Sequence, residues 1–131
     1  MTVRGPPISD AESRVMGELW KHAPQASEPI AQTLHADTGW HENTVRTLLN
    51  RLVRKGAVRA ERDGRRYLYS PVLTRGAWQT RESRSLLDCV FGGRVAPMLV
   101  HFSRTEKLSA RDVAELRNLV EQLDKKEHRD E

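Results

Sequence analysis

The sequence lacks several features that define whole classes of protein. Only one of its 131 residues is a cysteine, so no disulfide can form within the chain, and we expect a reducing, cytoplasmic setting. No apolar run approaches the ~20 residues that a membrane-spanning helix needs, so no membrane partner is expected. The first residues have no apolar stretch of the kind found in secretory signals. Glycine and proline are too scarce for a disordered or fibrous chain.

The usual motifs of catalysis and metal binding are also missing. The sequence has no glycine-rich phosphate loop, and its serine, histidine and aspartate residues form no recognisable hydrolase motif. Its five histidines do not have the spacing of metal ligands. We therefore predict a protein that is not an enzyme and that needs no metal or other cofactor.

The chain does have a strong local excess of positive charge. Its net charge is +4, with 22 basic and 18 acidic residues. Residues 41–66 contain eight of the basic residues and three of the acidic ones, which gives this segment a net charge of +5. The rest of the chain is therefore close to neutral. Arginine concentrated in one segment is typical of proteins that contact phosphates, although a solvated basic surface is the ordinary alternative.

Two short helices are predicted before residue 40. Ser9 and Glu12 have the spacing of a capping box, which satisfies two backbone donors at a helix start, and this helix is expected to end near His22. Ser27 is expected to cap the second helix, and Gly39 is expected to end it.

The third predicted helix is the clearest, because one apolar stripe runs along it at helical spacing. The stripe consists of Val45, Leu48, Leu49, Leu52 and Val53. Gly56 is well placed to end this helix in a left-handed conformation. The polar and basic side chains that lie off the stripe are Asn43, Thr44, Arg46, Thr47, Asn50, Arg51 and Arg54.

After residue 57 the periodicity changes from helical to alternating. Residues 58–61 and 66–70 alternate between apolar and polar side chains, and Asp63-Gly64 between them is a strong hairpin turn signal. Arg65 lies at the tip of this hairpin. Three helices followed by a β-hairpin is the element order of a winged-helix DNA-binding domain.

The chemistry of the third helix fits double-stranded DNA as a partner. A helix fits the major groove of B-DNA, where Arg can bind guanine, Asn can bind adenine and a Thr methyl can touch thymine. We expect Arg46 to read a base, and Arg51 and Arg54 to contact phosphates. Arg65 is expected to contact a neighbouring backbone or minor groove. Asn43 has an alternative role at the start of the helix.

The second half of the chain returns to helical spacing. Thr74 can cap a helix that Gly92-Gly93 breaks, and Cys89 within it is expected to be a small buried hydrophobe. A short apolar stretch follows at residues 95–102. The last helix has an apolar stripe made of Val113, Leu116, Leu119, Val120 and Leu123. A lone terminal helix cannot bury such a long stripe, so we expect it to pair with a second copy of the chain.

Together these elements predict a mainly α-helical fold with a small β-hairpin wing. Residues 1–73 are expected to form the winged-helix DNA-binding domain, and residues 74–131 a helical dimerisation region. A chain of this size with a modest core also favours an oligomer, which buries surface that one copy leaves exposed.

Several runs in the sequence are similar to a known family. They include Thr44 to Leu52 (TVRTLLNRL), Lys55-Gly56, Arg66 to Pro71 (RYLYSP) and Phe91 to Gly93 (FGG). Together they resemble the penicillinase repressor family, and the resemblance extends over about residues 7–126. It implies a homodimeric transcriptional repressor that binds palindromic operators in front of β-lactamase or other resistance genes.

The resemblance also implies how such a repressor is released. In this family a membrane-bound sensor and a linked protease lead to cleavage of the repressor. Met98 to Ser103 resembles the segment that is cut, which places the candidate cleavage site between His101 and Phe102. The alternative is that residues 95–102 form only a core helix of the dimerisation region. Copper-sensing relatives have a C-terminal cysteine cluster, which this sequence lacks.

Two other functions remain open on the sequence. One is a winged-helix regulator that is released from DNA by a small ligand or another signal. The other is a protein-interaction module, in which the arginines of the third helix and hairpin would be incidental. Strong salt dependence of DNA binding separates the DNA-binding hypotheses from the last one.

Overall fold

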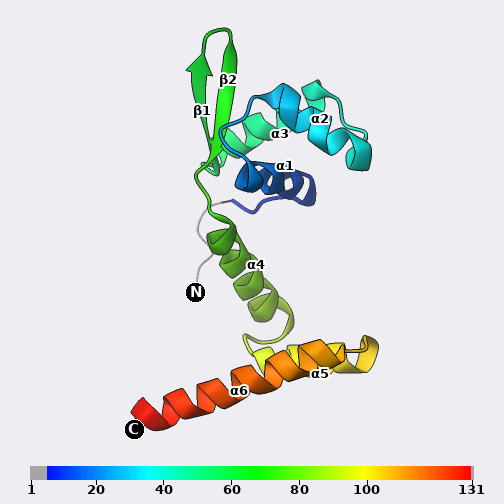
Figure 1. The fold of residues 1–131 in the computed structure, drawn as a ribbon, viewed down its shortest axis with the longest axis vertical. Coiled ribbons are helices and arrows are strands. Elements are labelled where there is room, and N and C mark those ends of the chain that lie inside the picture. The colour runs from blue at the N-terminus through cyan, green and yellow to red at the C-terminus, as the bar shows by residue number, and fades with distance from the viewer. Residues whose placement is uncertain (1–5, 131) are drawn as a thin grey trace. The chain divides into compact units, whose positions relative to one another are not determined.

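The computed structural model describes residues 6–130, and the side chains of residues 6–128. Figure 1 shows that these residues form helices and one hairpin. The elements are α1 (Asp10–Lys21), α2 (Ser27–Thr38), α3 (Glu42–Arg54), β1 (Val58–Asp63), β2 (Arg66–Pro71), α4 (Arg75–Val90), α5 (Val95–Thr105) and α6 (Ala110–Asp130). The predicted fold class, a mainly helical chain with a hairpin wing, is confirmed.

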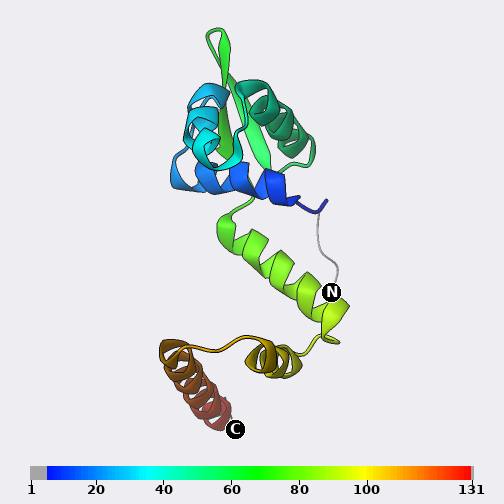
Figure 2. The same ribbon diagram turned by 90° about the vertical axis from the view of Figure 1, so that its right-hand side faces the viewer.

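The first three helices pack around one apolar core together with the base of the hairpin (Figure 2). The predicted stripe of α3 supplies much of it, since Val45, Leu49 and Leu52 are completely buried. Val53 is the exception: its side chain is 37% exposed because it lies at the edge of the stripe. Figure 2 shows α1, α2 and α3 gathered beside the hairpin. The side of α3 opposite its apolar stripe, called here its outer face, is exposed.

Local capping sets the ends of these helices. The Ser9 hydroxyl accepts from the Glu12 backbone N–H, and the Glu12 carboxylate accepts from the Ser9 N–H, so the predicted capping box is confirmed. Ser27 does not cap α2 as predicted, because Ala26 occupies the N-cap position and Ser27 begins the helix itself. Gly39 and Gly56 have positive φ angles of 71° and 78°, as expected of left-handed helix ends.

The hairpin is antiparallel, with Val58 opposite Pro71 and Asp63 opposite Arg66. The two residues that close its turn are therefore Gly64 and Arg65, one position later than the predicted Asp63-Gly64 pair. Gly64 takes the positive φ, 66°, that a tight hairpin requires at its first loop position. Arg65 consequently lies at the tip, as the sequence predicts.

The base of the hairpin is fixed to the helices by backbone hydrogen bonds. Gln25, just before α2, exchanges two of them with Tyr69 of β2, at 3.1 and 2.8 Å. Tyr69 is buried, whereas Tyr67, two residues earlier, is exposed. This alternation is what a strand with one face on the core requires.

The chain divides into two compact units, and the boundary between them lies between Ser85 and Leu86, inside α4. The predicted domain boundary at residues 73 and 74 coincides instead with the start of α4. The first turns of α4 belong with the helices before them, because Trp78 packs on Trp20 with ring centroids 5.3 Å apart. Residues 1–5 and 131 of the predicted domains lie outside the described residues, and the functional division at residue 73 stays a prediction.

The second unit buries little of its own apolar surface. Leu87 is its buried residue in α4, and no residue of α5 is buried. Cys89, predicted to be buried, is exposed, because it lies on the same face of α4 as the exposed Leu86 and Val90. At the start of α6 the Ser109 hydroxyl accepts from the Asp112 N–H at 3.0 Å.

One buried carboxylate ties the N-terminal helix to the end of α3. Glu12 is only 1% exposed, and its Oε1 atom accepts a hydrogen bond from Lys55 Nζ. Lys55 also donates to the Pro7 carbonyl at 2.8 Å. Burial raises the pKa of the Glu12 carboxyl, but the hydrogen bonds from Lys55 and Ser9 outweigh it, so the net pKa lies below its usual value.

We expect Glu12→Gln to lower the free energy of unfolding by about 1–3 kcal/mol at neutral pH, because the charged partner of Lys55 is lost. The wild-type carboxylate has a lower pKa folded than unfolded. Its stabilisation is therefore complete above the unfolded value of 4.5 and is lost as pH falls through the folded value. Urea unfolding of both proteins at one concentration from about pH 7 to pH 3 measures this. A difference that stays constant over this range would contradict the assignment.

Candidate nucleic-acid interface

The outer face of α3 carries all seven of the side chains predicted for it. Asn43, Thr44, Arg46, Thr47, Asn50, Arg51 and Arg54 are exposed. They face outward because the helix has 3.6 residues per turn and its opposite stripe is held in the core. The sequence pattern therefore determined which side of α3 is available to a partner.

Local hydrogen bonds occupy some of these side chains. The Thr47 hydroxyl donates to the Asn43 carbonyl at 3.0 Å, which leaves its methyl group and an oxygen lone pair for a partner. Asn43 does not cap α3, because the N-cap is His41. Arg51 and Arg54 form no side-chain hydrogen bond or ion pair with another described residue, so their guanidinium groups are available to phosphates.

The tip of the hairpin, residues 62–66, presents three arginines that differ in their contacts. Arg62 Nε donates to the Gly64 carbonyl at 3.2 Å, and Arg66 Nε lies 3.5 Å from an oxygen of Asp63. Arg65 forms neither kind of contact within the described part of the chain. Of the three, Arg65 is therefore the one whose guanidinium group is available to a partner. It is also the hairpin residue predicted from the sequence to contact DNA.

A groove joins α3 to the hairpin and to the start of α2. It is lined by Ala26, Ser27, Glu28, Pro29, Gln32, Glu42, Arg46, Asn50, Arg65, Arg66, Tyr67 and Tyr69. The groove brings together three of the predicted residues, Arg46, Asn50 and Arg65. The other predicted residues of α3 do not line it, so they present a separate part of the surface.

The two tyrosines of the groove were not singled out by the sequence, because their alternation reads only as strand periodicity. Burial raises the pKa of the Tyr69 hydroxyl, and the nearby Arg46 charge offsets only part of that rise. The phenol of Tyr69 is therefore neutral at physiological pH and remains able to donate a hydrogen bond. Tyr67 is half exposed on the same strand.

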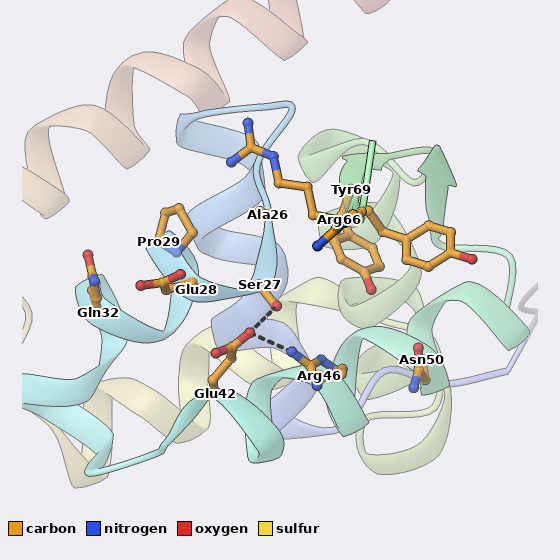
Figure 3. Close-up of a pocket in the computed structure, with 12 residues that line it drawn as sticks. Ala26, Ser27, Glu28, Pro29, Gln32, Glu42, Arg46, Asn50, Arg66 and Tyr69 are labelled. Carbon is orange, nitrogen blue, oxygen red and sulfur yellow. Dashed lines mark hydrogen bonds and ion pairs between the residues drawn. The ribbon is translucent and has the colours of Figure 1, made fainter. Parts of the chain in front are cut away.

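Glu42 is the residue that sequence reasoning missed. It is the first residue of α3, and its Oε1 atom accepts from Arg46 Nη2 at 2.5 Å and from the Ser27 hydroxyl at 3.0 Å (Figure 3). The spacing of four residues between Glu42 and Arg46 is a detectable signal for the ion pair. The contact with Ser27 has no such signal, since it depends on how α2 packs on α3.

Lys55 belongs to the basic segment by sequence but not to this surface. Its ammonium group is paired with the buried Glu12, so it contributes to the stability of the fold. The positive charge available to a partner therefore comes mainly from the exposed arginines of α3 and of the hairpin tip.

The C-terminal candidate residues lie in α5 and α6. His101 and Phe102 are exposed within α5, and the His101 ring lies 6.1 Å from that of Phe91. The bond between them lies within the helix α5, so cleavage at this bond would require local opening of that helix. Of the α6 stripe, Leu116 is partly buried, while the exposed members are Val113, Leu119, Val120 and Leu123.

The described residues lack two other kinds of site. None of their helices combines the length and apolar character needed to cross a bilayer. No three His, Cys, Asp or Glu side chains among them gather closely enough to hold a metal ion.

Comparison with known proteins gives a consistent result. The penicillinase repressor of Bacillus licheniformis is 31% identical over 117 residues, which cover 89% of this chain and 91% of that protein. The methicillin resistance regulatory protein MecI of Staphylococcus aureus is 26% identical over 86% of this chain and 92% of that protein. The solution structure of the DNA-binding domain of the repressor BlaI is 35% identical, with a TM-score of 0.50, over 55% of this chain and 88% of that domain.

The family model for penicillinase repressors matches residues 8–122. That match spans the winged helix, α4, α5 and more than half of α6, so it includes both compact units. On this match and on the fold, the chain belongs to the penicillinase repressor family of DNA-binding transcriptional repressors.

Proposed function

We propose that this protein is a homodimeric repressor that binds a palindromic operator upstream of a β-lactamase gene or another resistance gene. The observation that carries the proposal is the outer face of α3, where seven exposed polar and basic residues lie opposite an apolar stripe that is buried except at Val53. The names of the two curated relatives support the resistance context, since one represses penicillinase and the other regulates methicillin resistance.

In this proposal α3 enters the major groove and the hairpin tip contacts the adjoining backbone. Arg46 reads a base, with Asn50 beside it, because guanidinium and amide groups match the hydrogen-bonding edges of guanine and adenine. Arg51 and Arg54 contact phosphates and set the register. Arg65 contacts the DNA outside the major groove. On the protein, Arg65 and Arg46 line the same groove.

The dimer forms through the C-terminal unit. Four apolar side chains of α6 are exposed, and α5 buries none of its residues, so this unit has apolar surface that its own chain does not cover. Pairing of the α6 stripe with the same stripe of a second copy covers it and creates two-fold symmetry. A palindromic operator has the same symmetry, so each winged helix meets one half-site.

Relief of repression occurs by cleavage between His101 and Phe102 by a sensor-linked protease. The cut separates α6 from the winged helix, and the DNA-binding half loses its connection to the dimer interface. Each free winged helix then binds one half-site without the effective concentration that a dimer supplies. Release by a small ligand is the alternative, and it predicts intact protein after induction.

The proposal is tested first by DNA binding itself. A preferred duplex is selected from a random library with the full-length protein, and its mobility shift is compared with that of a scrambled duplex at two salt concentrations. A repressor binds the selected duplex more tightly, with a steep salt dependence. A protein-interaction module shows neither the preference nor the slope.

The arginines of α3 and of the hairpin tip should differ in their effects. Arg46→Ala should weaken binding to the selected duplex by about 1–3 kcal/mol and relax the preference at one position of each half-site. Arg65→Ala should weaken all duplexes equally and reduce the salt slope by about one unit. Binding isotherms on a set of singly substituted duplexes measure both. If Arg46→Ala keeps its full base preference, α3 does not read the operator.

Removal of α6 should produce monomers. A chain that ends at residue 108 keeps the winged helix and loses the α6 stripe, so it should sediment as a monomer and bind a full palindrome weakly. Its affinity for a single half-site should match that of one winged helix in the full-length protein. A truncated chain that still sediments as a dimer would place the interface elsewhere.

Induction should leave a specific fragment. Mass spectrometry of the protein from β-lactam-treated cells should detect an N-terminal fragment that ends at His101, because the proposed cut lies directly after it. His101→Pro should abolish the fragment if the protease needs this bond, with thermal melting of the variant as the folding control. Intact repressor together with induced transcription would exclude proteolytic relief.

A further inference from the structure

We infer that Glu42 is a specificity-determining residue. It positions Arg46 to contact the edge of a base, and it disfavours contact between Arg46 and a phosphate. The inference rests on the proposed function, because it assumes that α3 binds DNA. It concerns the contacts among Ser27, Glu42 and Arg46, which join the first turn of α2 to the first two turns of α3 (Figure 3).

The geometry fixes the carboxylate before DNA arrives. Ser27 is buried, and its hydroxyl donates to the same Glu42 oxygen that accepts from Arg46. A glutamate four residues before a basic residue is the favourable order for a helical ion pair. An isolated exposed pair of this kind is weak because two long side chains must be ordered together. Here the core-anchored serine has already restricted the glutamate, so Arg46 has a partner in a defined position.

The ion pair leaves Arg46 able to read a base. A guanidinium group has five N–H donors, and one nitrogen, Nη2, is engaged with Glu42. Bidentate recognition of guanine requires two donors, so the remaining ones suffice. The side chain of Arg46 is 52% exposed, which keeps those donors accessible from the outer face of α3.

The carboxylate acts differently on the two kinds of DNA contact. The acceptors on a guanine edge are neutral, whereas each phosphate carries a full negative charge. A phosphate near Arg46 is therefore repelled by Glu42, while a base edge is repelled much less. Non-specific binding depends almost entirely on phosphates, so Glu42 weakens non-specific binding more than specific binding.

Glu28 provides a matched control. It is exposed in the first turn of α2 and lines the same groove, but no ion pair joins it to Arg46 among the described residues. Glu28→Gln and Glu42→Gln therefore remove the same charge from the same groove, and only the second removes the partner of Arg46. Glutamine at position 42 keeps an oxygen that accepts from Ser27, so the packing of α2 on α3 is preserved.

The experiment compares affinities of the full-length protein for the selected duplex and for a scrambled duplex of equal length. Glu42→Gln should tighten binding to the scrambled duplex by about fivefold and steepen its salt slope by about one unit per bound protomer, because Arg46 becomes free to contact a phosphate. Binding to the selected duplex should tighten less, so the ratio of the two affinities falls. Glu28→Gln should leave that ratio unchanged.

A double variant shows whether Glu42 acts through Arg46. In an Arg46→Ala background, Glu42→Gln should no longer change the ratio of the two affinities, because the guanidinium group that it restrains is absent. A merely structural role of Glu42 would instead lower both affinities together and reduce the thermal midpoint. The inference is overturned if Glu42→Gln lowers both affinities and the thermal midpoint. It is also overturned if Glu42→Gln changes the ratio of the two affinities no more than Glu28→Gln does.

The two levels of failure are distinguishable. If the wild-type protein does not prefer its selected duplex over the scrambled one, the proposed DNA-binding function fails. If the wild-type protein discriminates and Glu42→Gln discriminates equally well, only the role of Glu42 fails.

Discussion

The packing of α3 against α1 and α2 is the constraint on which the rest of the interface depends. Val45, Leu49 and Leu52 are completely buried, and each such side chain contributes about 1.5–3 kcal/mol when it leaves water. Rotation of α3 about its axis would expose all three at once. A single polar contact on the outer face is worth about 0.5–1.5 kcal/mol, so the core decides which side chains face a partner. Arg46, Arg51 and the other polar residues of α3 face solvent because the apolar stripe on the opposite side of the helix must be buried in the core.

The hairpin and the start of α2 shape the surface beside α3. The paired backbone hydrogen bonds between Gln25 and Tyr69 hold β2 against the helices, which brings Arg65 and Arg66 into the same groove as Arg46. Positive charge alone would favour any phosphate. The Glu42 carboxylate introduces a negative charge into this basic surface, and Ser27 keeps it beside Arg46. The two sides of the groove therefore differ: Arg46 of α3 is restrained by an ion pair, whereas Arg65 at the hairpin tip is not.

The two compact units differ in how much apolar surface they bury. The first has a dense core that reaches into α4 through Trp20 and Trp78. The second leaves large apolar side chains exposed on α5 and α6, including Phe102, Val120 and Leu123. A small unit of this kind gains stability from surface that a second copy covers. The proposed dimer would cover this apolar surface and would also pair the two DNA-binding surfaces.

The sequence by itself determined the local features of this protein. The capping box at Ser9, the stripe of α3 and the hairpin all depend on residues that are neighbours along the chain, and periodicity or short spacing encodes such contacts directly. The tertiary structure decided the rest: the shift of the α2 N-cap from Ser27 to Ala26, the exposure of Cys89, the extension of the first unit into α4 and the anchoring of Glu42. Lys55 also appeared as one more surface charge until its partner, Glu12, was placed beside it. The contacts of Glu42 with Ser27 and of Glu12 with Lys55 join residues far apart in sequence. They depend on how the helices pack, and the sequence pattern of one helix does not specify which helix packs against it.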